Sequence, residues 1–237
     1  MKVVTWNCNG AFRKKFEAID ALNADILVIQ ECEDPLQCSD SSYKNWAKNY
    51  LWVGDTKHKG LGVFCKDHIQ LNKNDWENND TKYLISARIN KTFDLIAVWT
   101  QRNNSVTYEY IGQFWKYLQV NRENMNECIV LGDFNSNKIW DRMRRVCNHS
   151  DVVRELEEIG IFSLYHKHHN RVQGEEVHPT FYMYRNLAKP YHIDYIFVSR
   201  QMIPSTTSFE IGDSTFWLTI SDQLPVIAVL DVSPRSA

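Results

Sequence analysis

Short apolar runs rich in β-branched residues recur along the chain and predict a protein with many strands. The runs are Val3–Trp6, Ile26–Gln30, Leu61–Phe64, Leu84–Ile89, Leu95–Thr100, Ile129–Leu131, Tyr195–Ser199 and Val226–Leu230. Residues 26–29 are apolar at every position, so we expect strands of this kind to be covered on both faces.

Apolar residues at helical spacing fill several intervals between these runs. One helix is predicted by Phe12, Phe16, Ile19 and Leu22, and a second by Ile111, Phe114, Trp115 and Leu118. A third begins at Ser150 as its N-cap and stops at Gly160. Two packed sheets with helices outside them accommodate this alternation of elements.

Polar side chains stand where several of the predicted strands end. They are Asn7, Asn9, Glu31, Asp133 and Asn135. Open α/β sheets place ligand sites at the carboxyl ends of strands, so we expect these side chains to meet at one edge. A single Asn or Asp at such a place is usually a turn residue, but Glu31 is harder to explain in that way, because Glu is no turn former.

Two further acids stand at the beginnings of strands instead. Asp194 opens Tyr195–Ser199, and Asp222 lies shortly before Val226–Leu230. These acids can join the first group only if their strands run antiparallel to the others. Both sheets are therefore predicted to be mixed.

Carboxylate and amide oxygens gathered in one place suit a hard cation such as Mg²⁺, whereas zinc prefers His and Cys. Clustered carboxylates repel one another and keep their charges at low cost only around a cation. An ionised Asp can orient or deprotonate a water molecule, and a neutral Asn can donate to a phosphoryl oxygen. The set predicts metal-assisted hydrolysis of a phosphoester.

Composition narrows the possible partners and compartments. The net charge is −2 and the pI about 6.4, so the chain lacks the basic excess of a general nucleic-acid coat protein. Six cysteines without a C-x-x-C pair argue against a structural zinc site and for reduced thiols. Because no secretory segment follows Met1 and no apolar stretch approaches the ~20 residues of a membrane span, we expect a cytoplasmic protein.

Five segments together resemble the endonuclease/exonuclease/phosphatase superfamily, whose members include AP endonucleases and deoxyribonuclease I-like enzymes. They are Thr5–Gly10, Ile29–Glu31, Leu131–Ser136, His192–Ile196 and Ser221–Val226, in the family's order and across nearly the whole chain. The resemblance implies an α/β fold, a four-layer α/β/β/α sandwich of two mixed sheets flanked by helices. The chain is expected to form a single domain over residues 1–232, followed by a frayed tail at 233–237.

The resemblance also implies roles for the polar residues. Glu31 would be the principal ligand of Mg²⁺, or of Mn²⁺, with Asn7 and Asp222 close to the metal. Asp133 would position or deprotonate the attacking water, and Asn135 would bind the scissile phosphate. Asp194 would orient the family's catalytic His.

This catalytic His is missing. The family's closing motif reads Ser-Asp-His, and this chain has Gln223 in the third position. A Gln amide donates a hydrogen bond but delivers no proton, so chemistry that needs the proton is expected to be slower by ~10²–10⁴. Two explanations stay open: Gln223 is natural and marks a weakened enzyme, or it was introduced to trap a substrate.

Four residues are candidates for substrate binding: Asn9, Trp99, Thr180 and Arg185. Trp99 stands where relatives carry His or Tyr aimed at the phosphate, and core packing is its alternative. Thr180 and Arg185 belong to a segment that contacts phosphate and base, or to an ordinary strand with a solvated Arg.

Two charged clusters carry weaker signals. Residues 141–145 are read as a solvated helix face, with a grip on a nucleic-acid backbone as the alternative. The His-rich stretch at 166–169 is read as a loop, and we do not expect it to hold a metal.

Three functions remain in competition. A nuclease acting on DNA or RNA is favoured, with nucleic acid as the partner. The first alternative is a phosphatase or phosphodiesterase acting on a small-molecule or lipid phosphoester, which suits the acidic pI. The second is a non-catalytic binding protein, suggested by Gln223 and Trp99.

Overall fold

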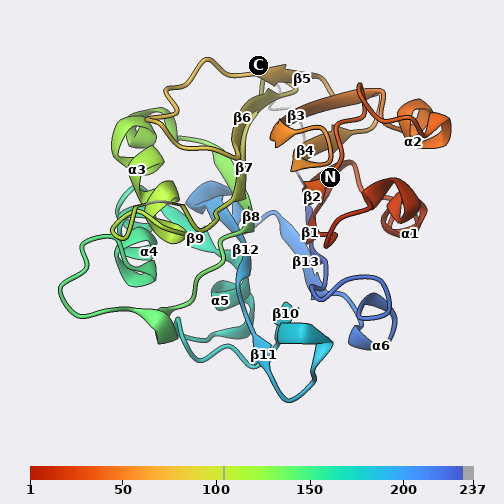
Figure 1. The fold of residues 1–237 in the computed structure, drawn as a ribbon. Helices are drawn as coiled ribbons and strands as arrows, with labels where there is room; N and C mark the ends of the chain where they lie inside the picture. Colours follow the sequence, from red (N-terminus) through yellow and green to blue (C-terminus); the bar gives the residue numbers. More distant parts are fainter. Residues whose placement is uncertain (104, 232–237) are drawn as a thin grey trace.

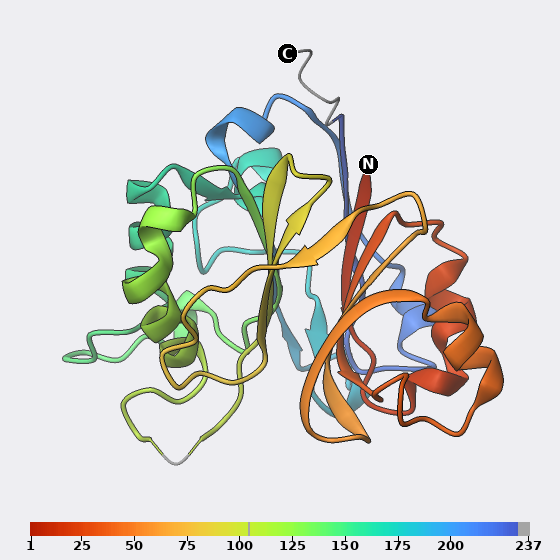
Figure 2. The same ribbon diagram turned by 90° about the horizontal axis from the view of Figure 1, so that it is seen from above.

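The computed structural model describes residues 1–103 and 105–231. Two six-stranded sheets pack face to face, and helices cover the outer face of each sheet (Figures 1 and 2). The predicted four-layer α/β/β/α sandwich is therefore confirmed. The tail expected at 233–237 lies outside the described residues.

In the first sheet, the strand nearest the N-terminus pairs with the strand nearest the C-terminus of the described residues. Its strands, in spatial order, are β13 (Thr206–Ile211), β14 (Val226–Leu230), β1 (Lys2–Asn7), β2 (Ile26–Cys32), β4 (Lys59–Cys65) and β3 (Asn49–Thr56). Strand β1 runs parallel to β2 and antiparallel to β14. This sheet is mixed, as the placement of its polar residues predicts.

The second sheet repeats that arrangement. Its strands are β5 (Leu71–Lys73), β6 (Leu84–Ile89), β7 (Phe93–Trp99), β8 (Cys128–Asp133), β12 (Asp194–Ser199) and β9 (Ile161–Ser163). Strand β8 is parallel to β7 and antiparallel to β12, and Asp133 and Asp194 are direct register partners. Because β12 runs antiparallel to β8, Asp194 at the start of β12 lies beside Asp133 at the end of β8.

Alternation along the strands divides the core. On β7, Leu95, Ala97 and Trp99 face the core between the sheets, while Ile96 and Val98 pack with the helices outside. Both faces of the central strands are buried, which explains their continuously apolar sequences. Strands with partly exposed faces, such as β3 and β13, have mixed sequences, and the apolar pattern did not reveal them.

The helical predictions need two corrections. The first pattern is not one helix, because a 3₁₀ turn at Phe12–Lys14 precedes α1 (Phe16–Asp20). The third helix, α4 (His149–Glu158), is capped by Asn148 and not by Ser150. A reciprocal capping box between Asn148 and Asp151 sets this boundary, since the Asp151 carboxylate accepts the Asn148 N–H at 3.0 Å.

Both charged clusters also differ from the prediction. Residues 166–169 are helical, as the end of α5 (Leu164–His169), whereas residues 141–145 form an irregular turn before α4. The Arg145 guanidinium donates to the Thr107 and Glu109 carbonyls and so ties this turn to the segment before α3. The remaining helices are α2 (Ser41–Trp46), α3 (Ile111–Asn121) and α6 (Ser214–Trp217), and Phe181–Tyr182 and Pro190–Tyr191 pair as β10 and β11.

All six cysteines are free thiols. No helix within the described residues is long and apolar enough to cross a membrane. At the edge where β1, β2 and β8 end, the two sheets bring the predicted site residues together.

Candidate active site

A β-bulge in the first sheet determines the position of Glu31. Strand β2 does not end at Gln30 as expected but continues to Cys32, and its pairing with β4 shifts between Gln30 and Cys32. Glu31 is the extra residue of this bulge and has a φ of 65°. A bulge turns a side chain out of the ladder, and bulges are common beside active sites. The Glu31 carboxylate is thereby aimed toward Asn7, whose Nδ2 lies 3.4 Å from Oε1.

Asp133 is the centre of the site. It is fully buried at the end of β8 and accepts four hydrogen bonds, all from amide groups. Oδ2 accepts from Asn7 Nδ2 at 2.9 Å, Asn135 Nδ2 at 3.0 Å and Gln223 Nε2 at 3.1 Å. Oδ1 accepts from the Asn135 backbone N–H at 2.9 Å. Predicted site residues from three separate segments thus converge on one carboxylate.

Burial is the dominant electrostatic influence on these acids. It raises the pKa of Asp133 to about 6, against the opposing effect of the hydrogen bonds from Asn7, Gln223 and Asn135. Burial, and then the nearby charge of Asp133, raise the pKa of Asp194 well above its usual range. The donors around Asp133 are neutral, so none of them compensates its charge fully.

Asp194 and Gln223 share an unusual feature. Both Asp194 carboxylate oxygens and the Gln223 Oε1 are buried, and no described residue donates a well-aligned hydrogen bond to them; the neighbouring Thr180 hydroxyl lowers the pKa of Asp194 against the effect of burial. Buried polar atoms are normally paired, and exceptions concentrate at functional sites. Residue 223, where the family has a His, therefore lies in a region whose buried acceptor oxygens could receive a further hydrogen bond.

Backbone contacts fix the segment that carries Asp222 and Gln223. The Trp6 indole donates to the Gln223 carbonyl at 3.0 Å, and the Ser221 hydroxyl donates to the Asn7 carbonyl at 2.8 Å. The Gln223 N–H in turn donates to Ser221 Oγ at 3.1 Å. These bonds hold residues 221–223 against the end of β1, although more than 200 residues separate the two segments in sequence.

Cations surround the outer part of the site. Asp222 is partly buried; burial raises its pKa, which the nearby Glu31 also raises and Arg185 and Lys15 lower. Arg185 is exposed and donates to the Thr219 carbonyl at 3.3 Å, so its guanidinium lies at the rim. Asn9 is exposed as well, and its backbone N–H donates to Asn7 Oδ1 at 3.0 Å. Both predicted substrate contacts are accessible.

The other two substrate candidates are not accessible. Thr180 is fully buried, and its hydroxyl accepts the N–H groups of Ile193 and Asp194 at 3.0 and 3.1 Å. The structure uses this hydroxyl to hold the start of β12, and its role as a substrate contact stays a prediction. Trp99 is only 4% exposed and packs in the core between the sheets. For Trp99, core packing is the correct alternative.

Sequence reasoning missed one residue beside Glu31. Lys59, at the start of β4, places Nζ 2.8 Å from Glu31 Oε2 and lies over the Trp99 ring, 5.6 Å from its centroid. No pattern in the sequence marks Lys59, since it follows an ordinary polar hairpin turn. Only the pairing of β4 with β2 brings it to the site.

The oxygen-rich donor set fits a hydrated hard cation. Within the described part of the chain, no three His, Cys, Asp or Glu side chains are grouped closely enough to hold a metal ion by themselves. Glu31 and Asp222 supply two carboxylates and Asn7 an amide oxygen. Mg²⁺ usually keeps several waters and binds through one or two carboxylates plus substrate phosphates, so this set suits it.

A cavity of about 320 Å³ adjoins Asn135. Aromatic and apolar side chains of Tyr110, Trp140, Phe181 and Ile193 line it, together with the polar side chains of Arg142, Arg145 and Asn148. The cavity therefore offers rings and hydrogen-bonding groups next to the polar cluster.

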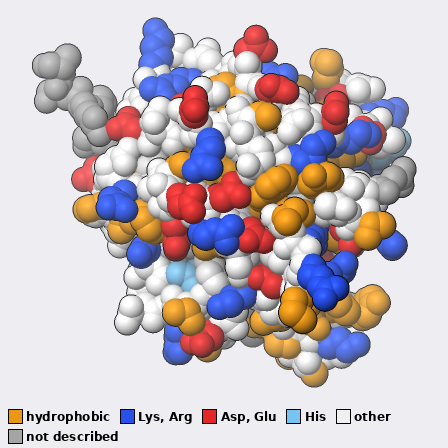
Figure 3. Space-filling view, turned by 90° about the vertical axis from the view of Figure 1, so that its left-hand side faces the viewer, with side chains coloured by type: hydrophobic (Ala, Val, Ile, Leu, Met, Phe, Trp, Pro, Cys, Tyr) orange, Lys and Arg blue, Asp and Glu red, His pale blue; other side chains and the backbone are white. Residues whose placement is uncertain are grey.

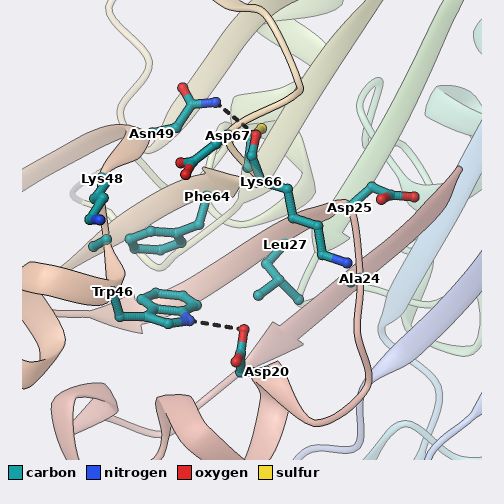
Figure 4. A pocket seen from close by; sticks show the side chains of 12 residues that line it. Asp20, Ala24, Asp25, Leu27, Trp46, Lys48, Asn49, Phe64, Lys66 and Asp67 are labelled. Carbon is teal, nitrogen blue, oxygen red and sulfur yellow. Dashed lines mark hydrogen bonds between the residues drawn. The ribbon is translucent and has the colours of Figure 1, made fainter.

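A smaller cavity, of about 200 Å³, lies at the other end of β2 (Figure 4). The rings of Trp46 and Phe64 lie 5.1 Å apart in its wall, and the Trp46 indole donates to Asp20 at 2.9 Å. It contains none of the predicted site residues. The predicted site residues lie at the opposite edge of the sheet.

Comparison with known proteins agrees with this arrangement. Residues 4–222 match the Endonuclease/Exonuclease/phosphatase family. A search among curated proteins finds no significant match.

Solved structures show the same fold at low sequence identity. An AP endonuclease from Archaeoglobus fulgidus superposes with a TM-score of 0.70 at 19% identity, covering 98% of this chain and 100% of that one. The 3' phosphatase NExo from Neisseria, bound to a product DNA hairpin, gives 0.68 at 19% identity with the same coverage. The catalytic domain of Xenopus laevis APE2 gives 0.69 at 16% identity, covering 100% of this chain and 94% of that one. The family match and the shared fold lead to one conclusion: this chain is a member of the Endonuclease/Exonuclease/phosphatase family.

Proposed function

We propose that this protein hydrolyses phosphodiester bonds in nucleic acid with the help of a divalent metal ion, Mg²⁺ or Mn²⁺. The observation that carries the proposal is the buried Asp133 carboxylate, which accepts four amide hydrogen bonds beside Glu31. Solved relatives of this fold are phosphoester hydrolases by name, which agrees with the reaction class.

Glu31 is the principal metal ligand in this proposal, with Asn7 and Asp222 completing the protein's share. A bound divalent ion supplies Lewis-acid stabilisation of charge on the phosphoryl group. The nearby Glu31 carboxylate adds to the effect of burial in raising the pKa of Asp222, and a cation bound between the two carboxylates would relieve their repulsion.

Asp133 prepares the attacking water. Its pKa of about 6 leaves it ionised at neutral pH while keeping it basic enough to accept a proton, which is the range in which a general base is most effective. Asn7 and Asn135 fix its orientation and add no negative charge. Gln223 holds the place of a proton donor, but its amide can only donate a hydrogen bond.

The neighbouring cavity favours a nucleotide over a lipid. Its 320 Å³ and its lining of rings and guanidinium groups suit a sugar and base next to the phosphate bound by Asn135. One structural relative is an AP endonuclease by name, and another, a 3' phosphatase by name, is bound to a product DNA hairpin. We accordingly propose DNA, with RNA as an alternative substrate. We further propose a reducing, cytoplasmic location, with which six free thiols are compatible.

A specific observation supports a second candidate, a phosphatase acting on a terminal or small-molecule phosphate. The net charge of the chain is −2, and on the face that carries α3 and α4 the acidic and basic side chains of the described residues are interspersed (Figure 3). A long grip on a polyanion would need many phosphate contacts from Lys and Arg. A short substrate would need only a few such contacts.

The test is a substrate panel with the chain and its Gln223→His variant. Supercoiled plasmid, single-stranded DNA, abasic duplex, 3'-phosphate duplex, RNA and phosphoinositides are incubated with Mg²⁺, with Mn²⁺ and with EDTA. Metal-dependent cleavage of a nucleic acid by Gln223→His, lost in Gln223→His/Asp133→Asn, supports the proposal. Release of phosphate from phosphoinositides alone would favour a lipid substrate, and turnover that survives EDTA would rule out the metal.

A further inference from the structure

Glu31 already has a cationic partner. Its Oε2 is 2.8 Å from Lys59 Nζ, and its Oε1 faces the Asn7 amide at 3.4 Å. Both carboxylate oxygens are therefore engaged by N–H groups. A metal ion that binds Glu31 must share or replace one of these partners.

Lys59 is also held from its other side. Its Nζ lies 5.6 Å from the centroid of the Trp99 ring, within the range of a cation–π contact. Trp99 is buried and packs against Tyr83 with ring centroids 4.9 Å apart, so the platform is fixed. The Lys59 side chain itself remains 52% exposed and can leave Glu31 without repacking the core.

We propose that Lys59 is a resident counter-cation of Glu31, which occupies the carboxylate until a divalent metal displaces it. The inference rests on the proposed metal site and assigns Lys59 a role in setting metal affinity. An ammonium and a hard divalent ion seek the same carboxylate oxygen, and two cations side by side repel each other. The buried Trp99 then serves the site indirectly, as the surface on which Lys59 rests.

The expected effect is that of a partly exposed ion pair. Removing Lys59 should tighten metal binding by about three- to fivefold, the range that such pairs contribute. The measurement is isothermal titration of the substrate-free protein with MnCl₂. Lys59→Met keeps the aliphatic stem over Trp99 and deletes the charge.

A matched ion pair supplies the control. Lys82 Nζ lies 2.8 Å from Asp55 Oδ2, with both side chains more than half exposed and neither predicted to bind metal. Lys82→Met should bind Mn²⁺ as the unchanged protein does. Equal affinities in the Lys59→Met and Lys82→Met proteins would overturn the proposal.

Glu31→Gln separates this inference from the proposed function. If Glu31→Gln binds Mn²⁺ normally, Glu31 is no metal ligand, and both the metal assignment and the role of Lys59 fail. If Glu31→Gln loses binding while Lys59→Met behaves as Lys82→Met does, only the role of Lys59 fails.

Displacement can be observed directly in the unchanged protein. Amine labelling by an N-hydroxysuccinimide ester, read by peptide mass spectrometry, reports how free each lysine is. Saturating Mg²⁺ should increase labelling of Lys59 and leave that of Lys82 unchanged. Equal labelling of Lys59 with and without Mg²⁺, under conditions where titration shows binding, would also overturn the proposal.

Discussion

Two buried carboxylates are each bound by an asparagine of the segment after β8, and their pKa values shift in opposite directions. Asp133 is bound by the side chain of Asn135, and Glu176 by the side chain of Asn137, at 3.0 and 3.1 Å. Burial raises the pKa of Asp133 to about 6. Burial would also raise that of Glu176, but the hydrogen bonds outweigh it and lower the pKa to about 2.

The partners of Glu176 explain the difference. His166 Nε2 lies 2.9 Å from Oε1, and the Gly174 N–H donates to the same oxygen at 3.0 Å. The other ring nitrogen of His166, Nδ1, lies 2.7 Å from Ser163 Oγ. Each group in this cluster has a partner of matching character. The cluster ties residues 170–178 to α5 and acts as a structural support.

Around Asp133 the partners are neutral amides and further acids. None of these described partners carries a positive charge, and no described residue donates a well-aligned hydrogen bond to the two buried oxygens of the adjacent Asp194. Unfavourable electrostatics of this kind are tolerated where chemistry needs them. The comparison therefore separates a satisfied cluster, which stabilises the fold, from an unsatisfied one, which is available to a cation and a substrate.

Gln223→His should produce the largest change. A His ring can donate to the unpaired carboxylate of Asp194 and deliver a proton, so metal-dependent turnover should rise by roughly two to four orders of magnitude. Single-turnover rates measured on the cleaved substrate over pH 5 to 9 test this. A gain with no dependence on pH would mean that position 223 is not the proton donor.

Asp133→Asn in the Gln223→His protein should lower turnover by at least about a hundredfold, because the charge that prepares the water is lost. Substrate affinity, measured by fluorescence anisotropy with Ca²⁺ in place of Mg²⁺, should remain within a few-fold. Retention of more than about a tenth of the rate would contradict the role of Asp133 as a base.

Glu176→Ala should affect stability and not chemistry. Removing the buried carboxylate leaves the donors of Asn137, Gly174 and His166 without their acceptor, which lowers the free energy of unfolding by about 1–3 kcal/mol. Urea denaturation followed by tryptophan fluorescence measures the loss, and Glu175→Ala, at an exposed neighbouring position, is the control. Equal stability of the two variants would show that the cluster is not a support.

His192 should make stability depend on pH. Burial lowers its pKa from 6.5 to about 4, although its Nδ1 donates to the His178 carbonyl at 2.7 Å. Between pH 6.5 and 4, His192 is protonated in the unfolded chain but neutral in the folded protein. The free energy of unfolding therefore falls as the pH falls, by about 1.4 kcal/mol per pH unit.

His192→Asn keeps a donor for the His178 carbonyl and removes the titration. Its unfolding free energy should therefore lose this slope between pH 6.5 and 4. The exposed His68 provides the control variant His68→Asn, which should keep it. An unchanged slope in His192→Asn would assign the pH dependence to another group.

The sequence predicted a large part of the site, because strand ends are visible in apolar patterns. Asn7, Glu31, Asp133 and Asn135 stand directly after continuously apolar runs, and this placement led to the correct edge of the sheets. The acids before β12 and β14 led to the mixed strand directions. Local sequence is informative here because the central strands are buried on both faces.

The sequence by itself predicted where the central strands lie along the chain, which polar residues stand at their ends and which family motifs are present. All three can be read from residues that are neighbours in sequence. The tertiary structure alone decided which groups meet across the sheets. It buried Thr180 and Trp99, which the sequence had offered to a substrate, and it brought Lys59 to Glu31. It also set the opposite pKa shifts of Asp133 and Glu176, because the energy of a buried charge depends on partners that are distant in sequence.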